Sequence, residues 1–162
     1  MVGMTSIYID ADACPVKEQI YRTAARYGLD VFVVANSWMR VPDQPGVTFV
    51  QVDGGADVAD DWIAESAGTD DIVATADLPL AGRALERGAT AIDFRGKEFT
   101  PAAIGDLLAS RAIAQQLRML DVHTGGPRPL TPRDRGLFAG KLDEVVNRIR
   151  RQQRLREELP PR

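Results

Sequence analysis

The feature that most constrains the fold of this chain is the alternation of short apolar segments with segments of helical periodicity. Five apolar runs of strand type are separated by stretches whose apolar residues recur at helical spacing, and Gly or Pro lies at most of the boundaries. Strands that alternate with helices build parallel sheets through right-handed crossovers. We therefore predict an α/β fold, a three-layer sandwich around a central, mostly parallel five-stranded sheet.

The boundaries of these elements follow from local signals. Pro15 is assigned to the first turn of the first helix, and Gly28 to its C-cap. Thr-Pro pairs at 100–101 and 131–132 are assigned to the starts of the last two helices. The expected strands are 4–10, 31–35, 47–52, 72–75 and 89–94, and the expected helices are 15–27, 56–67, 79–87, 102–120 and 132–155.

Length and residue types restrict the sites that the chain can build. Its 162 residues suit a single domain, expected over 1–155, with a disordered tail at 156–162. Cys14 and His123 are the only cysteine and histidine, which excludes an intrachain disulfide, a cysteine zinc site and a multi-histidine site. Any metal must then be bound mainly by oxygen. No apolar run has transmembrane length and there is no signal-peptide pattern, so we expect a cytoplasmic protein without membrane contact.

Four aspartates lie where the predicted sheet would bring them together. Asp10 and Asp12 follow the first strand, and Asp77 ends the fourth. Asp60 lies on the helix before the fourth strand. In an open parallel sheet, ligands bind outside the carboxyl ends of the strands, where strand order reverses. Carboxylates gathered there need a cation or a proton, and an all-oxygen cluster suits Mg²⁺ or Mn²⁺. Metal-dependent phosphodiester or phosphoryl chemistry is therefore the leading hypothesis.

Three of these acids, but not Asp10, also have a purely structural interpretation. Asp12 can cap the first helix, and Asp77 can cap the third. Acids early in a helix are favoured by the helix dipole, which suits Asp57 better than Asp60. We prefer Asp60 to Asp61 as a ligand because Asp60 flanks the apolar face of its helix, whereas Asp61 is expected to face solvent.

Two further residues stand near the predicted site. Asp93 also ends a strand, but that strand is expected at the edge of the sheet, so Asp93 ranks fifth among the acids. Cys14 is interpreted as a small buried residue rather than a nucleophile. Neighbouring carboxylates oppose the lowered thiol pKa that a reactive cysteine needs.

Charge is distributed unevenly along the chain. Residues 1–110 carry 8 Lys and Arg against 17 Asp and Glu, whereas residues 111–162 carry 12 against 6. An acidic body with a basic final third fits a metal site beside a phosphate-binding surface, although a solvated basic helix gives the same pattern. The residues that we assign to substrate or phosphate binding are Asn36, Arg40, Thr124, Gly125, Gly126, Arg128, Arg133 and Arg135.

Taken in order, several segments resemble the YaiI/YqxD family of uncharacterised bacterial proteins, a domain-of-unknown-function family. The resemblance runs from about residue 7 to residue 151, nearly the whole chain, and implies no activity by itself. The matching segments are IDADACP at 9–15, VAN at 34–36 with RVP at 40–42, DVAD at 57–60, TADLPLA at 75–81, TGGP at 124–127, RDR at 133–135 and FA at 138–139.

That family is in turn similar to PIN-like nuclease domains, which have a parallel sheet and an acidic cluster that binds Mg²⁺ or Mn²⁺ for RNA cleavage. Their acids end strand one, lie on a central helix and end strand four, and Asp10, Asp60 and Asp77 match that order. The resemblance implies that these three side chains hold the metal. This chain departs from the pattern by its second acid, Asp12, and by carrying Asp rather than the more usual Glu on the helix.

Three functions stay open on the sequence alone. The first is a metal-dependent nuclease acting on RNA, with Asp12 as a further ligand or a support for the ligands. The second is a haloacid-dehalogenase-type phosphatase, in which Asp10 takes the phosphoryl group and Asp12 donates a proton to the leaving group. Such enzymes also have a Thr shortly after, where this chain has Cys14 and Pro15. The third is a non-catalytic RNA- or nucleotide-binding module.

Overall fold

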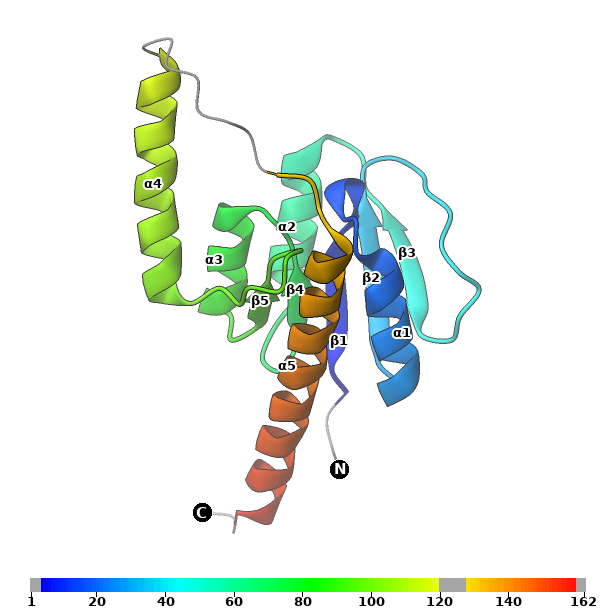
Figure 1. The fold of residues 1–162 in the computed structure, drawn as a ribbon. Coiled ribbons are helices and arrows are strands. Elements are labelled where there is room, and N and C mark those ends of the chain that lie inside the picture. Colours follow the sequence, from blue (N-terminus) through cyan, green and yellow to red (C-terminus); the bar gives the residue numbers. More distant parts are fainter. Residues whose placement is uncertain (1–3, 120–127, 160–162) are drawn as a thin grey trace.

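The structure is a computed structural model that describes residues 4–119 and 128–159, and it contains a five-stranded sheet with helices on both faces (Figure 1). Each strand is three to six residues long and carries mostly apolar side chains. The elements are β1 (Ser6–Asp10), η1 (Ala11–Ala13), α1 (Lys17–Tyr27), β2 (Asp30–Ala35), β3 (Val47–Gln51), α2 (Ala56–Ser66), β4 (Ile72–Ala74), α3 (Leu78–Glu86), β5 (Thr90–Ile92), α4 (Pro101–Met119) and α5 (Pro132–Glu158).

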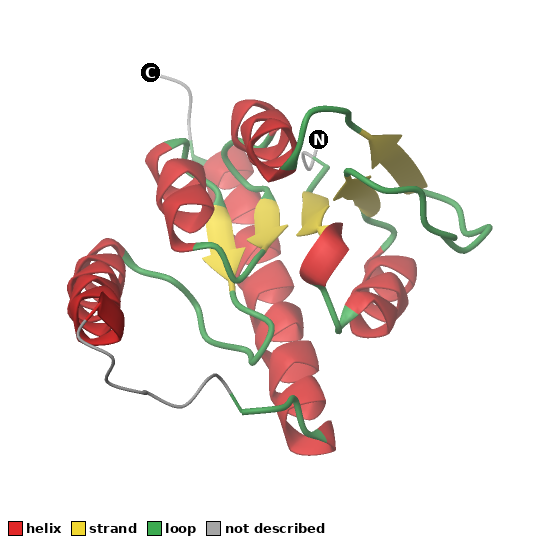
Figure 2. Ribbon diagram, turned by 90° about the horizontal axis from the view of Figure 1, so that it is seen from above, coloured by secondary structure: helices red, strands yellow, loops and turns green. Residues whose placement is uncertain are grey.

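The order of the strands creates one point where the chain changes direction across the sheet. The order is β3-β2-β1-β4-β5, and all four pairings are parallel, so the predicted α/β fold with a five-stranded sheet is confirmed. From β1 the chain moves outward to β2 and β3, then crosses back through α2 to β4 on the other side of β1. The carboxyl ends of β1 and β4 therefore flank the switch point at which such sheets bind ligands. Figure 2 looks down onto this edge.

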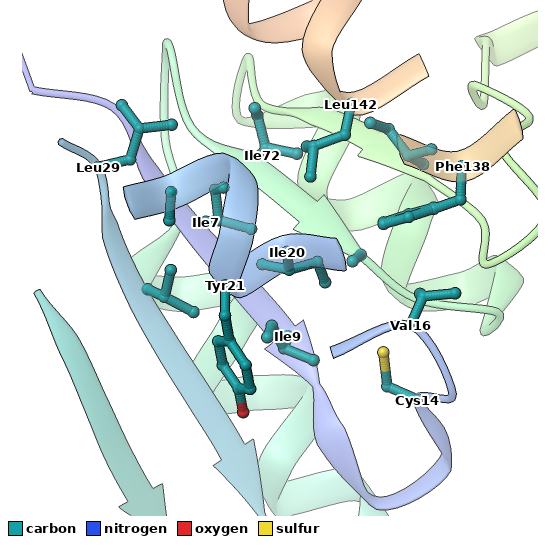
Figure 3. Close-up of a cluster of buried hydrophobic side chains, with 14 of the residues drawn as sticks. Ile7, Ile9, Cys14, Val16, Ile20, Tyr21, Leu29, Ile72, Phe138 and Leu142 are labelled. Atoms are coloured by element: carbon teal, nitrogen blue, oxygen red, sulfur yellow. The ribbon is translucent and has the colours of Figure 1, made fainter. Parts of the chain in front are cut away.

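Different helices cover the two faces of the sheet. Along β1, Ile7 and Ile9 belong to the core under α1 and α5, whereas Tyr8 belongs to the core under α2 and α3. Figure 3 shows the first core, in which Phe138 and Leu142 of α5 pack onto the sheet. The apolar stripe predicted on the last helix is confirmed, since its five members are buried: Phe138, Leu142, Val145, Val146 and Ile149.

Most of the predicted helix ends are confirmed. Gly28 ends α1 with a left-handed φ of 67°, which glycine adopts without strain. The Thr100 hydroxyl accepts a hydrogen bond from the Ala103 N–H at 3.1 Å. Thr131 forms a capping box with Asp134 at the start of α5. Local sequence signals therefore fixed these ends.

The start of the first helix differs from the prediction. Helix α1 begins at Lys17, and Pro15 lies outside it. The short 3₁₀ turn η1 comes directly after β1, and Cys14 is extended, with φ −87° and ψ 115°. A proline disfavours helical geometry in the residue before it, which agrees with the extended Cys14. The helix begins two residues after Pro15, and its N-cap is Val16.

Helix α5 runs farther than predicted. It continues through Glu158, so residues 156–158 of the expected disordered tail are helical, and 160–162 lie outside the described residues. Gln153 is buried, and Arg156 pairs with Asp70 in the loop before β4. These contacts extend the docking of α5 beyond its apolar stripe. The expectation of a single domain over 1–155 stays a prediction.

Candidate functional site

The candidate site starts from two carboxylates at the ends of neighbouring strands. Asp10 ends β1, and Asp77 lies three residues beyond the end of β4. The buried hydroxyl of Thr75 links them: it donates to Asp10 Oδ2 at 2.9 Å and accepts from the Asp77 N–H at 3.0 Å. The predicted meeting of these two segments at the switch point is therefore present.

One oxygen of Asp77 has a structural task. Its Oδ1 accepts a hydrogen bond from the Leu80 N–H at 2.8 Å, so Asp77 caps α3. The structural interpretation of Asp77 is thus correct for this oxygen. It does not exclude a second role, because a carboxylate has several acceptor positions.

Asp60 is the third member of the cluster. It is half-buried on α2, and burial raises its pKa to about 6, with further raising contributions from the charges of Asp77 and Asp10. Asp61 is exposed and pairs with Arg83 at 2.7 Å. The preference for Asp60 over Asp61 therefore agrees with the environments of the two side chains.

Asp10 carries the same electrostatic signature. Burial raises the pKa of its carboxyl, the hydrogen bond from Thr75 opposes that change, and the charges of Asp77 and Asp12 raise the pKa further. A group of acids whose ionised forms oppose one another gains stability from any bound cation. We call Asp10, Asp60 and Asp77 the acidic cluster.

The acids are not arranged as a finished coordination site. Within the described residues, no three acidic, histidine or cysteine side chains stand close enough to share one metal ion. Asp77 is partly engaged as a helix cap, and Asp12 turns toward another strand. The donor set of carboxylate oxygens nonetheless suits a hard divalent cation.

Asp12 lies in η1 rather than at the start of α1. Its Oδ2 accepts hydrogen bonds from the backbone N–H and the side-chain amide of Asn36, at 2.9 and 3.4 Å. The structural interpretation that Asp12 caps the first helix is therefore wrong. Instead, Asp12 ties the end of β1 to the end of β2.

Cys14 and Asp93 are both structural residues in this arrangement. Burial raises the pKa of the Cys14 thiol to about 11, and Figure 3 shows its sulfur in the core beside Val16. Asp93 follows the edge strand β5, and its Oδ1 accepts from the N–H groups of Arg95 and Lys97, both at 2.9 Å. That carboxylate shapes a turn.

The basic residues form a network that the sequence did not predict. Arg128 binds both carboxylate oxygens of Asp134, and Arg95 binds Asp134 Oδ2 at 2.9 Å. These contacts, led by the hydrogen bond from Arg128, hold the pKa of the Asp134 carboxyl far below its ordinary range. The signal that points to Asp134 is its position three residues after Thr131, the spacing of a capping box.

The other predicted phosphate contacts lie in different settings. Arg135 donates to the carbonyl of Pro15, which joins α5 to the segment after η1. Arg40 and Arg133 are exposed. Asn36 is engaged with Asp12, and the predicted contacts at Thr124, Gly125 and Gly126 lie outside the described residues.

A cavity of about 390 Å³ lies between the segments that follow β1, β4 and β5. Ala13 directly follows Asp12, and Ala76 directly precedes Asp77, but none of the four predicted acids lines this cavity, and Asp60 lines a separate cavity of about 350 Å³. Two guanidinium groups line the first cavity. Its lining residues are Ala13, Pro15, Ala76, Asp93, Phe94, Arg95, Arg128 and Leu130.

Comparison with known proteins gives the family. The family described as "Uncharacterized BCR, YaiI/YqxD family" matches residues 8–148. The chain belongs to the YaiI/YqxD family. It is 52% identical over 148 residues to a UPF0178 protein of Caulobacter sp. (strain K31), covering 91% of the chain and 98% of that relative. It is 51% identical over 151 residues to a UPF0178 protein of Bradyrhizobium sp. (strain ORS 278), covering 93% and 92%.

Membership of the YaiI/YqxD family confirms the resemblance drawn from the sequence motifs, and the family description names no activity. No solved structure matches the chain, so the similarity to PIN-like nuclease domains stays a prediction. None of the helices in the described part of this YaiI/YqxD-family protein combines the length and apolarity that a membrane span requires.

We expect Asp60 to make the stability of this YaiI/YqxD-family protein depend on pH. Its native pKa of about 6 lies above the ordinary aspartate value near 3.9. Between these values the native state binds more protons than the unfolded state, so the free energy of unfolding falls as pH rises. Without metal, Asp60→Asn should therefore raise the melting temperature above pH 6 by about 2–4 °C, or about 1 kcal/mol after screening. The gain should vanish near pH 4, and a gain that is equal at both pH values would contradict the assignment.

Proposed function

We propose that this protein is a divalent-metal-dependent nuclease that hydrolyses phosphodiester bonds, with RNA as its substrate. The observation that carries the proposal is the acidic cluster at the switch point. Burial raises the pKa of Asp10 and of Asp60, and the charge of Asp77 raises both pKa values further. Such perturbed groups beside a cavity are typical of functional sites. The capping role accounts for one oxygen of Asp77 but not for the pKa of Asp60, which burial raises and the charges of Asp77 and Asp10 raise further.

The oxygen donors of the cluster are of the type that Mg²⁺ or Mn²⁺ prefers, although in this structure they do not stand close enough to share one ion. Asp10, Asp60 and Asp77 would hold the ion, and Asp12 would add a ligand or orient the end of β1. The bound ion would supply an activated water and would stabilise the leaving oxygen of the phosphodiester. The chain's own residues would bind the substrate and hold its phosphate in one position.

Cationic groups close to the cavity are suited to hold the substrate phosphates. Arg95 and Arg128 border the cavity and share the single carboxylate of Asp134, which leaves an excess of positive charge. Arg133 lies nearby in the first turn of α5 and is exposed. These side chains would position a phosphodiester against the acidic cluster by contacts to its backbone, without reading the base sequence.

The phosphatase alternative receives less support from the same contacts. Its proton donor would be Asp12, but Asp12 Oδ2 is occupied by two hydrogen bonds from Asn36. That mechanism also has no use for Asp60, which lies on a different element from the nucleophile.

The test compares two kinds of phosphate ester. The purified protein is incubated with Mn²⁺ and either labelled single-stranded RNA or a panel of phosphomonoesters, with EDTA as the control. We expect RNA cleavage that requires Mn²⁺ and no phosphate release from monoesters. Release from monoesters with a trapped acyl-phosphate at Asp10 would favour the phosphatase. The absence of both activities, with RNA still bound, would favour a non-catalytic module.

A further inference from the structure

The connection between β2 and β3 is unusual for a parallel sheet. Neighbouring parallel strands are ordinarily joined by a crossover that contains a helix. Here residues 36–46 return the chain from the end of β2 to the start of β3 with no helix, and the loop passes along the outside of the sheet (Figure 1). Irregular loops at the carboxyl edge of a sheet are common places for binding residues.

Side chains along this loop alternate between core and solvent. Met39 and Val41 pack against the core under α1 and α5, where a crossover helix would otherwise lie. Trp38, which precedes Met39, is 72% exposed. Arg40, which lies between Met39 and Val41, is exposed as well. The loop thus partly buries a methionine and leaves the larger tryptophan exposed to solvent.

That choice runs against the usual burial of large apolar side chains. Tryptophan is strongly buried on average, and a shift of the loop by one residue would exchange Trp38 with Met39. The second tryptophan shows the ordinary pattern: Trp62 is half-buried and its ring lies 6.0 Å from those of Tyr8 and Phe32. The exposed indole is therefore accessible to a ligand and has little packing role.

The loop is attached directly to the candidate site. Asn36, its first residue, donates its backbone N–H to Asp12, and Asp12 raises the pKa of Asp10. Trp38 is two residues beyond Asn36, and Arg40 two residues beyond Trp38, a reach of at most about 7 Å for each step. An exposed aromatic ring and an exposed cation therefore lie in the loop within four residues of the contact between Asn36 and Asp12.

We propose that Trp38 and Arg40 form a binding platform for single-stranded nucleic acid. A base stacks on the Trp38 indole, Arg40 contacts a backbone phosphate, and the adjoining phosphodiester extends toward Asp10. A flat ring beside a cation matches the two features of a nucleic-acid strand, its base faces and its charged backbone. The inference rests on the proposed function because it names how that substrate reaches the acidic cluster.

Binding is tested without divalent metal, so that cleavage plays no part. Single-stranded RNA is titrated in EDTA against Trp62→Phe, whose only tryptophan is Trp38, and against Trp38→Phe, whose only tryptophan is Trp62. We expect RNA to quench the fluorescence of the first protein and to leave that of the second nearly unchanged. Quenching confined to Trp38→Phe, or absent from Trp62→Phe at saturating RNA, would overturn the platform.

Affinity measurements with matched controls complete the test. Trp38→Ala should raise the Kd for RNA by about 5- to 100-fold, whereas Trp38→Phe should retain most of the affinity. Arg40→Ala should make the slope of log K against log salt shallower by about 0.7. Leu155→Ala and Arg151→Ala, which alter exposed residues in the second half of α5, should change neither quantity.

The outcomes separate this inference from the proposed function. Binding that depends on Trp38 in a protein without cleavage activity would support the platform and reject the nuclease. Metal-dependent cleavage by the wild type, together with unchanged RNA affinity in Trp38→Ala, would support the nuclease and reject the platform. A Trp38→Ala variant that binds RNA like the wild type but loses self-association or capture of a protein partner would show that the indole contacts protein, and would overturn the platform.

Discussion

Replacing Asp10 by Asn is expected to lower Mn²⁺-dependent RNA cleavage at least about a hundred-fold and to abolish the response of the melting temperature to the metal. Asn keeps an oxygen that can accept the hydrogen bond from Thr75, which Asp10 receives at 2.9 Å, but it removes the charge. A metal contributes several kcal/mol of charge stabilisation in the transition state, and each 1.4 kcal/mol is about tenfold in rate. Cleavage of labelled RNA and melting temperature with and without Mn²⁺ measure the two effects.

Without metal, the Asp10→Asn variant should be at least as stable as the wild type. Burial and the charges of Asp77 and Asp12 raise the pKa of Asp10, so its ionised form costs free energy in the native state. In the wild type, Mn²⁺ at 100 times its Kd should add about 2.7 kcal/mol, or about 5–10 °C. The matched control is Asp61→Asn, which removes an exposed charge paired with Arg83 and should keep both the cleavage and the metal response. A marked loss of stability without metal, together with an unchanged response to Mn²⁺, would make Asp10 a structural residue.

The sheet was predictable because its signal is local. The central strands are apolar on both faces, as in Ile72–Ala74, and such runs alternate with helices that carry one apolar stripe. The helix ends at Gly28, Thr100 and Thr131 were predictable for the same reason, since a cap depends on a few neighbouring residues. Strand order was not visible in the sequence, but a topology rule sufficed to expect Asp10 and Asp77 at one edge.

The contacts of the site were less predictable because each joins distant parts of the chain. The backbone N–H of Asn36 donates a hydrogen bond to Asp12, although 24 residues separate the two. Arg95 binds Asp134, which lies 39 residues farther along the chain. The sequence singles out Asp134 only by its capping-box spacing from Thr131. The length of α5 depends likewise on Arg156 and its partner Asp70. Periodicity locates an element, but it does not say which side chain will meet which across the fold.

The exposed tryptophan shows the same limit in a different form. The apolar residues Trp38, Met39 and Val41 give no indication of which side of the loop faces the core. The core under α1 and α5 accepts Met39 and Val41, and the outward position of Trp38 follows. Trp38, which we propose for binding, is recognised by its exposed position, and that position is known only from the three-dimensional arrangement.

A turn at the edge of the sheet presses its glycine against α5. Gly96 follows β5 with φ +86°, and a Cβ built there would lie 2.6 Å from the Leu137 carbonyl oxygen and 2.8 Å from the Phe138 nitrogen. Both are backbone atoms of a helix that is anchored by the buried Phe138 side chain, so neither can move aside cheaply. The same turn carries Arg95, which pairs with Asp134 beside the cavity.

Gly96→Ala is therefore expected to destabilise the protein by about 3 kcal/mol, with a fall in melting temperature of about 6–12 °C. About 1–2 kcal/mol comes from the left-handed backbone and the rest from overpacking against α5. Substitutions at two other glycines, measured by denaturant unfolding, separate the backbone contribution from the overpacking contribution. Gly28→Ala, with φ +67° and nothing within 4 Å of the added Cβ, should lose only the backbone term. Gly82→Ala, inside α3 and equally uncrowded, should gain about 0.5–1 kcal/mol from helix propensity. Equal losses at Gly96 and Gly28 would mean that the turn does not press on α5, and the support that this helix gives to Arg95 would then have to come from Asp134 alone.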